Sequence, residues 1–375
     1  MIESQRHLFD IPDEVVYLDC ASNAPLLRTV RQAGELGLDR KYHPWEMDRD
    51  EFERESETVR GLFASLIGAE TGDIAIVPST AYGIATAAQN LPITQGQNIV
   101  VIQDQFPSNV YAWVELASAN DATLLTTMRP ADDDWTTAVL ETINERTAIV
   151  AIPPCHWTDG SFLDLVAIGA HCREVGAAYV IDSTQATGAY PMDVEAIQPD
   201  FVACAGYKWL MCPYALGFLY AAPHRQRGRP LESHGLNHKA EAPGGTISYP
   251  AEFSDGGRRY DMGQRFSFIN VPMAIAGMSQ LQHWQVSKIH ETLSALMDYA
   301  AEKANSIGWS VPDRSHRIGH FIGMTPPAPL PNDIIPKLNQ EKIFLSKRGT
   351  GLRISPHLHS SQADIDRVFN LLGSL

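Results

Sequence analysis

Short hydrophobic runs recur along the chain from about residue 70 and alternate with amphipathic segments. Most of the intervening segments have a helical period, as in residues 107–119 and 162–175. The short runs are apolar throughout instead of alternating with polar residues, which is typical of strands buried on both faces of a mostly parallel sheet. The pattern predicts seven strands, at residues 74–77, 98–102, 122–128, 147–152, 177–182, 201–206 and 217–222.

This alternation predicts an α/β fold with a doubly wound sheet. An amphipathic helix is expected before the sheet, over residues 48–67, with Val59, Phe63 and Ile67 on its buried side. Helices and strands in this order cover both faces of such a sheet. The carboxyl ends of its parallel strands are where ligands bind in folds of this type.

The pattern changes after about residue 225. Residues 225–265 are rich in Gly, Arg and His and are expected to form loops, and one long helix is expected over residues 271–306. Short strands and a last helix follow, which is typical of an α+β unit. We therefore expect a large domain over residues 26–265 and a smaller one formed by residues 1–25 and 266–375. The late elements are expected at residues 318–324, 341–348 and 351–355 for the strands and from residue 362 for the helix.

The charge balance limits the possible partners. The chain has 375 residues, with 29 Lys and Arg against 44 Asp and Glu, and a formal net charge of −15. Such a field repels phosphate backbones, so nucleic acid is not an expected partner, although a local pocket can still bind a small anion. Residues 201–223 are apolar, but Lys208 lies among them. Because a lysine in mid-bilayer costs about 2.5–3.5 kcal/mol, we interpret this stretch as core and expect no membrane association.

The cysteines and the N-terminal residues indicate a cytoplasmic protein. The number of cysteines is odd, and they are far apart and mostly within apolar runs, as reduced thiols are. Residues 1–14 lack the order of charged, apolar and small residues of a signal peptide. The five cysteines are Cys20, Cys155, Cys172, Cys204 and Cys212.

Lys208 is the most informative residue, because it is the only charged one between Phe201 and Pro223. Burial of an amine disfavours its charged form and lowers its pKa, which makes it a nucleophile for carbonyl groups. The alternative is that only the aliphatic stem packs in the core while the amine reaches solvent. The sequence alone leaves both possibilities open.

Three other positions follow predicted strands. Asp182 ends one strand and could partner a pyridinium nitrogen, or could simply cap a helix or form an ion pair. Thr80 and Ala81 follow Ser79 at the start of a helix, where backbone N–H groups can bind phosphate, or where a hydroxyl merely caps the helix. Phe106 could stack on a flat ring or close the core. Each signal is weak alone, and their order along the chain is the informative feature.

With these residues in this order along the chain, the sequence resembles the class V aminotransferase family of fold-type I pyridoxal-phosphate enzymes. The family includes cysteine desulfurases, kynureninases and isopenicillin-N-epimerase-like proteins. The resemblance runs from VYLDCASNAPL at 16–26 to LRISPHLHSSQADID at 352–366 and is most specific over residues 181–220. It implies pyridoxal 5'-phosphate as cofactor, a large seven-stranded sheet domain with a smaller domain, and a homodimer with the site near the subunit interface.

The resemblance also implies individual roles. Lys208 would be the Schiff-base lysine and the base that moves the Cα proton, and Asp182 would bond the pyridinium nitrogen. Gln185 would bond the ring hydroxyl oxygen, and Phe106 would stack on the ring. Arg353 would bind the substrate α-carboxylate, which suits its planar fork. The remaining implied positions are Thr80 and Ala81 for the phosphate, Tyr207 for an added hydroxyl, and Asn23 in the substrate pocket.

The chain departs from the family pattern in several places. Ala205 and Gly206 stand where relatives often have a phosphate-binding hydroxyl, and Trp209 follows the lysine where relatives have small residues. Arg265 lies where relatives have a turn that reaches the partner's phosphate, so it could supply a charge there instead. No cysteine follows Cys212, which argues against desulfuration through an enzyme persulfide, since hydroxyls do not replace a thiolate nucleophile.

We expect an enzyme that acts at Cα of a small amino acid or amine, most plausibly an aminotransferase. A kynureninase-like hydrolase, a C–S or selenocysteine lyase and an amino-acid epimerase are alternatives on the same scaffold. A non-catalytic protein that binds the cofactor or an amino acid is an alternative of another class. No metal is expected, because the spaced histidines lack an HExxH pattern. No P-loop follows a strand, so the sequence does not support a nucleotide-dependent class either.

Overall fold

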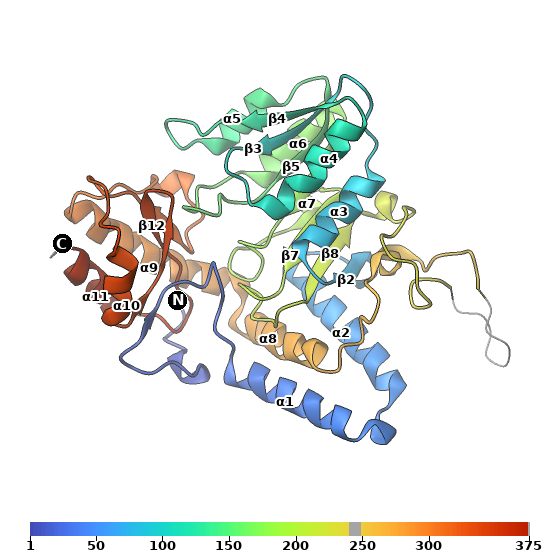
Figure 1. Cartoon of the computed structure of the whole chain (residues 1–375), viewed down its shortest axis with the longest axis horizontal. Coiled ribbons are helices and arrows are strands. Elements are labelled where there is room, and N and C mark those ends of the chain that lie inside the picture. Colours follow the sequence, from blue (N-terminus) through green and yellow to red (C-terminus); the bar gives the residue numbers. More distant parts are fainter. Residues whose placement is uncertain (240–248, 374–375) are drawn as a thin grey trace.

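The computed structural model describes residues 1–239 and 249–373, which form two lobes of unequal size (Figure 1). A seven-stranded sheet lies in the larger lobe. Its strands are β2 (Ile74–Val77), β3 (Asn98–Ile102), β4 (Thr123–Thr127), β5 (Thr147–Ile152), β6 (Ala178–Asp182), β7 (Phe201–Ala205) and β8 (Gly217–Ala221). Their order is β2-β8-β7-β6-β5-β3-β4, and only β8 runs antiparallel to its neighbours. The predicted mostly parallel sheet is therefore confirmed.

Helices cover both faces of this sheet, which explains its continuously apolar strands. Ile74 and Ile76 of β2 pack in the core on one face, and Ala75 and Val77 pack in the core on the other. The first face is covered by α2 (Arg49–Ile67), α5 (Trp135–Thr142), α6 (Leu165–Val175) and α8 (Asn270–Trp284), and the second by α3 (Thr80–Asn90) and α4 (Tyr111–Ala119). The sheet is thus doubly wound.

Local signals in the sequence set the helix ends. The Asp48 side chain accepts a hydrogen bond from the N–H of Asp50 at the start of α2, and Gly68 ends the helix with a φ of 70°. Asp164 and Gly176, with a φ of 75°, do the same for α6. Two further helices complete the lobe: α1 (Arg28–Tyr42), which packs on α8, and α7 (Val194–Ile197).

The smaller lobe contains a separate hydrophobic core. In it, Val16 from near the N-terminus packs with Met297 and Ile354, and Figure 1 shows both chain ends in this lobe. The division at residues 25 and 265 stays a prediction. The elements here are β1 (Val16–Tyr17) paired with β10 (Ile343–Phe344), the sheet of β11 (Ser346–Arg348), β12 (Gly351–Ile354) and β9 (Ile322–Met324), and helices α9 (Val286–Ser306), α10 (Ile334–Gln340) and α11 (Gln362–Leu372).

The single long helix expected over residues 271–306 is wrong. It is two helices, α8 and α9, separated at Gln285, whose φ is 65°. Met278 of α8 packs in the core of the large sheet, whereas Met297 of α9 packs in the core of the smaller lobe. A single straight helix would have to pack against both cores at once. The positive φ of Gln285 provides the change of direction between α8 and α9 instead.

Three shorter elements also differ from prediction. The helix expected from residue 107 begins with a 3-10 turn at Pro107–Asn109, before α4. The strand expected from residue 318 is reduced to β9, since Gly319 has a φ of 98°. The strand expected at 341–348 is divided between two sheets as β10 and β11.

Residues 240–248 of the expected loop region lie outside the described residues. Among the described helices, none has the length and hydropathy that a bilayer span requires.

Candidate active site

The ends of five strands meet at one edge of the large sheet. β7, β6, β5 and β3 run parallel, and β2 has the same direction because both it and β7 are antiparallel to β8. The segments after these strands therefore converge around a cavity that opens to solvent, with about 580 Å³ of empty space. All seven residues predicted to bind the cofactor line this cavity, namely Thr80, Ala81, Phe106, Asp182, Gln185, Tyr207 and Lys208.

Lys208 lies in the loop between β7 and β8, with only 5% of its surface exposed. Within residues 1–239 and 249–373, no hydrogen bond or ion pair engages its amine. Its Nζ lies 5.3 Å from the ring centre of Phe106 and 5.6 Å from that of Tyr207. Burial lowers the pKa of Lys208 to about 8, although the charge of Asp182 acts in the opposite direction. The amine is therefore buried, unpaired and easily made neutral, so the alternative of a solvated amine is wrong.

Asp182 is the last residue of β6 and is paired in the sheet with Ala203 of β7, which places it near the start of the Lys208 loop. Its Oδ1 accepts a hydrogen bond from the N–H of Thr184 at 3.0 Å. Burial raises the pKa of Asp182, and the charge of Lys208 lowers it in part. A buried carboxylate that lines the cavity is suited to bond a cationic N–H group of a ligand.

The N-terminus of α3 faces the same cavity. Ser79 caps this helix, since its Oγ accepts a hydrogen bond from the N–H of Tyr82 at 3.2 Å. Thr80 and Ala81 are the first helical residues, so their N–H groups have no carbonyl partner within the helix. The Thr80 hydroxyl lies 2.8 Å from that of Thr184. Free N–H groups and the helix dipole make this end of the cavity suited to an anion such as a phosphate.

Gln185 is held by two hydrogen bonds from opposite sides. Its Nε2 donates to the carbonyl oxygen of Ala21 at 2.9 Å, and its Oε1 accepts from Nε1 of Trp209 at 2.9 Å. Both Gln185 and Trp209 are buried. These two bonds fix the orientation of the amide and leave its second N–H to donate to a ligand.

Aromatic rings form the outer part of the cavity. Phe106 exposes 36% of its surface, which is high for a phenylalanine at a strand end and leaves a ring face available for stacking. Its ring meets that of Trp157 edge-on at 5.5 Å. Tyr207 stacks on Tyr214 at 4.1 Å.

The two residues predicted for the substrate lie outside the cavity lining. Arg353 is fully buried, and its guanidinium donates to the carbonyl oxygen of Trp157 at 2.7 Å and to Asp19 and Ser22 at 3.2 and 2.6 Å. Its Nε–H has no partner among the described residues. Asn23 is exposed. The charge of Arg353 nevertheless lowers the pKa of Lys208, so Arg353 lies within electrostatic reach of the amine.

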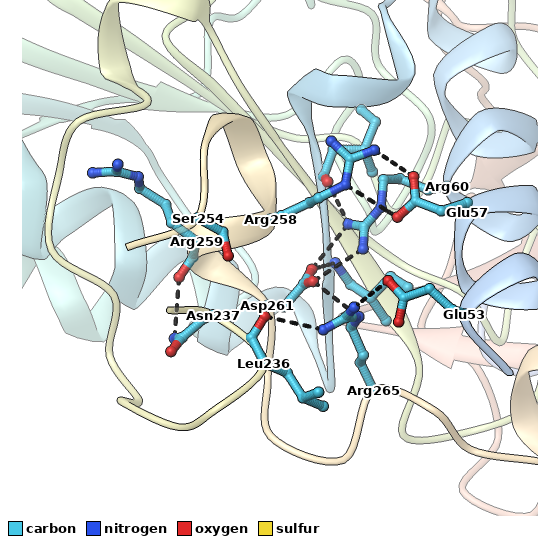
Figure 2. A network of polar contacts seen from close by, with 12 residues as sticks. Glu53, Glu57, Arg60, Leu236, Asn237, Ser254, Arg258, Arg259, Asp261 and Arg265 are labelled. Carbon is cyan, nitrogen blue, oxygen red and sulfur yellow. Dashed lines mark hydrogen bonds and ion pairs between the residues drawn. The ribbon is translucent and has the colours of Figure 1, made fainter. Parts of the chain in front are cut away.

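Arg265 does not line the cavity but belongs to a buried ionic network (Figure 2). Its guanidinium contacts Glu53 at 2.7 Å and Asp261 at 3.3 Å, and Asp261 also pairs with Arg60 at 2.9 Å. Asp261 further accepts a hydrogen bond from the N–H of Ile76 in β2. The guanidinium thus links α2 to the edge of the sheet, and the idea that Arg265 supplies charge to a phosphate gains no support from these contacts.

Several residues of the cavity were not singled out from the sequence. Gln105 is buried, and its Nε2 has no partner among the described residues. Thr184 joins the Thr80 hydroxyl to the N–H of Ala205. For Gln105, its place directly before Phe106 was the available signal. Thr184 lies between two residues that were predicted, so proximity in sequence could have indicated it.

The cysteines and histidines provide no separate site in the part of the chain that the structure describes. All five cysteines are buried, and Cys155, the one that lines the cavity, has a pKa raised well above its usual value by burial and by nearby carboxylates. A protonated thiol of this kind is a poor nucleophile. Among the described residues, no group of His, Cys, Asp or Glu side chains is arranged to hold a metal ion.

Comparisons with known proteins agree with this geometry. A family model described as "Aminotransferase class-V" matches residues 16–368. The "Uncharacterized aminotransferase YcbU" of Bacillus subtilis is 25% identical, over 97% of this chain and 95% of the relative. A "Probable cysteine desulfurase" of Methanothermobacter thermautotrophicus is 28% identical, over 57% of this chain and 55% of the relative. A solved structure of the cystine C–S lyase C-DES has a TM-score of 0.88 at 17% identity and covers 97% of this chain and 98% of that one.

Proposed function

Because this chain belongs to the class V aminotransferase family, we propose that it is a pyridoxal-phosphate enzyme that cleaves a C–S bond at Cβ of an amino acid. The observation that carries the proposal is the amine of Lys208, which is buried in a cavity, has no hydrogen-bond or ion-pair partner in the described part of the chain, and is poised to lose its charge near neutral pH. Membership of this family of enzymes argues against the alternative of a non-catalytic binding protein.

The residues of the cavity fit the cofactor of this family. A phosphate suits the free N–H groups of Thr80 and Ala81, and a cationic ring nitrogen suits the buried carboxylate of Asp182. The unpartnered amide nitrogen of Gln105 lies in the same lining, and a buried donor without a partner is costly unless a ligand satisfies it. When bound, pyridoxal phosphate withdraws electrons from bonds at Cα of the amino acid.

We assign the remaining roles to the chain's own side chains. Lys208 holds the cofactor and moves the proton at Cα, and Asp182 keeps the ring nitrogen protonated. Phe106 stacks on the ring, and the free N–H of Gln185 donates to the ring hydroxyl oxygen. Arg353 remains the predicted contact of the substrate α-carboxylate, and Tyr207 and Asn23 also remain predicted contacts. A homodimer and a cytoplasmic location also remain predictions.

C–S cleavage by elimination needs one base at Cα and no thiol of the enzyme. The cavity offers that base in Lys208, whereas the cysteine in its described lining, Cys155, has a raised pKa. The cystine C–S lyase C-DES shares the fold over nearly the whole chain, and cysteine desulfurases are among the relatives. The absence of a cysteine after Cys212 argues against the persulfide route and leaves direct elimination. Water then completes the products, which are a thiol, pyruvate and ammonium.

Transamination, the outcome expected first from the sequence, stays a prediction and is the second candidate. It is favoured by the YcbU relative, which is described as an aminotransferase and aligns over 97% of this chain. It uses the same base and the same α-carboxylate contact. Kynureninase-like hydrolysis and epimerisation use the same scaffold and also stay predictions.

The test is an assay of the cofactor-loaded protein with L-cystine and S-alkyl-L-cysteines. Elimination is expected to release pyruvate and ammonium in equal amounts, together with an equal amount of thiol from the S-alkylcysteines or of cysteine persulfide from cystine. A keto acid that retains the sulfur, without ammonium, would show transamination instead. Absence of any cofactor uptake would contradict the whole proposal.

The pKa of Lys208 predicts how cofactor uptake depends on pH. Only the neutral amine bonds a carbonyl, and burial places its pKa at about 8. The rate at which cofactor-free protein takes up pyridoxal phosphate should therefore rise about tenfold per pH unit below pH 8 and level off above it. Stopped-flow absorbance measures this rate. A rate that still rises up to about pH 10 would indicate an ordinary solvated lysine and contradict the prediction.

The hydrogen bond from Trp209 to Gln185 should be visible in the cofactor spectrum. In Trp209→Phe the Gln185 amide oxygen loses its donor, so the amide can turn and its N–H no longer stabilises the ring oxyanion. The midpoint of the pH-dependent absorbance change should move up by as much as about one unit, since a neutral hydrogen bond contributes roughly 0.5–1.5 kcal/mol. Trp284→Phe is the matched control, because its indole donates to Gln5. Equal midpoints in both variants would contradict the role of Trp209.

A further inference from the structure

Arg348, at the end of β11, is a half-buried arginine that forms no ion pair among the described residues. Its Nη2 donates to Oγ of Ser22 at 2.7 Å, and its Nη1 donates to the carbonyl oxygen of Lys347 at 3.3 Å. Its Nε–H is buried without a partner in the described part of the chain. A guanidinium held by neutral oxygens alone retains its full charge, and three of its five N–H donors remain for a ligand.

Arg348 shares its anchor with Arg353, and among the described residues only one carboxylate serves the pair. Both guanidinium groups donate to Oγ of Ser22, at 2.7 and 2.6 Å, and Ser22 in turn donates to Asp19 at 2.8 Å. Asp19 forms an ion pair with Arg353 at 3.2 Å but none with Arg348. The two cations therefore repel each other, and burial, together with the charge of Arg348, lowers the pKa of Arg353. The cluster of Arg348, Arg353 and Asp19 therefore has one positive charge in excess, which is available to a ligand.

A chain of ring contacts connects Arg348 to the reacting amine. Cζ of Arg348 lies 5.4 Å from the ring of Trp157, Trp157 meets Phe106 at 5.5 Å, and Phe106 lies 5.3 Å from Nζ of Lys208. Trp157 and Phe106 both line the cavity around Lys208. Two aromatic rings therefore separate Arg348 from the amine that acts at Cα, so its guanidinium is placed to meet a group further along the substrate side chain.

The other charges around Arg348 are already paired or exposed. Arg348 lines a polar hollow of about 1120 Å³ next to the cavity, together with Arg129, Asp104, Asp133 and Asp159. Arg129 contacts Asp133 at 3.5 Å and Asp159 at 2.8 Å, and Asp104 is exposed. Among the described residues that line this hollow, Arg348 is the cation that forms no ion pair with a carboxylate.

We propose that Arg348 binds a second anionic group, on the side chain of the substrate, and that the enzyme prefers amino acids whose side chain ends in a carboxylate beyond Cβ. This rests on the proposed function, and it adds the class of substrate to it. A guanidinium binds a carboxylate through two parallel N–H donors, which gives both charge and geometric selection. Arg353 retains the α-carboxylate, so the two arginines divide the two anionic ends of one substrate.

A matched pair of substrates tests this division. S-carboxymethyl-L-cysteine and S-carbamoylmethyl-L-cysteine have the same shape, but only the first carries the second charge. The kcat/KM for pyruvate release by the cofactor-loaded protein should be about 10- to 100-fold higher for the carboxylate, the range of a charge-assisted hydrogen bond. In Arg348→Gln the ratio should fall toward one, and in Arg348→Lys it should be restored in part. Lys347→Gln, which removes an exposed cation from the same strand, should leave the ratio as in the parent.

A binding measurement separates failure of this inference from failure of the proposed function. Calorimetry of the cofactor-loaded protein should show tighter binding of glutarate than of butyrate, and Arg348→Gln should remove that difference. If neither cysteine derivative is processed but glutarate still binds preferentially through Arg348, the reaction is wrong and the anion site stands. The inference would be overturned if Arg348→Gln lowered kcat/KM by the same factor for both substrates. It would also be overturned if the parent protein bound glutarate no more tightly than butyrate. Melting temperatures of the variants verify that each is folded.

Discussion

Replacement of Lys208 by alanine is expected to abolish turnover, with a loss of at least about 10⁴-fold. Among the described residues that line the cavity, Lys208 has the only amine, and it supplies both the bond to the cofactor and the base at Cα. The visible absorbance band of the cofactor-loaded protein should be lost as well. Borohydride reduction followed by mass spectrometry should place the cofactor mass on Lys208 in the parent protein and nowhere in the variant.

The folded state should survive this substitution. Lys208 is 5% exposed and its amine forms no hydrogen bond or ion pair among the described residues, so its removal eliminates the cost of burying an amine, which offsets the loss of its charge near Asp182. The melting temperature of Lys208→Ala should therefore not fall below that of the parent. Lys288→Ala, at an exposed position of α9, is the control for loss of a lysine. Retained activity in Lys208→Ala would refute the central assignment.

Replacement of Asp182 by asparagine is expected to slow the chemical step by roughly 10²–10⁴-fold, the range of a positioned proton-transfer partner. A neutral amide cannot hold the ring nitrogen in its protonated form, so electron withdrawal from Cα weakens. Asparagine can still accept the hydrogen bond from the N–H of Thr184, so the fold should be nearly intact. Rapid-mixing absorbance with a deuterated Cα substrate measures the proton-transfer step directly.

Asp200 provides the matched control for this second prediction. It is another buried aspartate of the same sheet, placed just before β7, and its carboxylate accepts from the N–H of Tyr179. Asp200→Asn should lower the melting temperature, because Arg225 and His224 lose their shared partner, while the chemical step keeps its rate. If Asp182→Asn slowed the reaction no more than Asp200→Asn does, the pyridinium role of Asp182 would be contradicted.

The strands of the large sheet could be predicted closely because their signal is local. A run such as NIVVI at 98–102 is apolar at nearly every position, and the structure has β3 at those five residues. The same locality explains the wrong helix over 271–306. Its hydrophobic period continues through Gln285, and nothing in that period shows that α8 and α9 bury their apolar faces in different cores.

The sequence by itself determined the α/β fold, because strand hydrophobicity is a property of short segments, and its resemblance to a family indicated seven of the residues that line the cavity, although not Gln105 or Thr184. Only the tertiary structure decided which side chains are free to bind a ligand. Gln185 presents an N–H because Trp209 helps to fix the orientation of its amide, and Arg353 is paired with Asp19 while Arg348, among the described residues, has no acid partner. The ion pair of Arg353 joins residues 334 positions apart. The energies of such contacts depend on distance and burial in space, which no local pattern along the chain encodes.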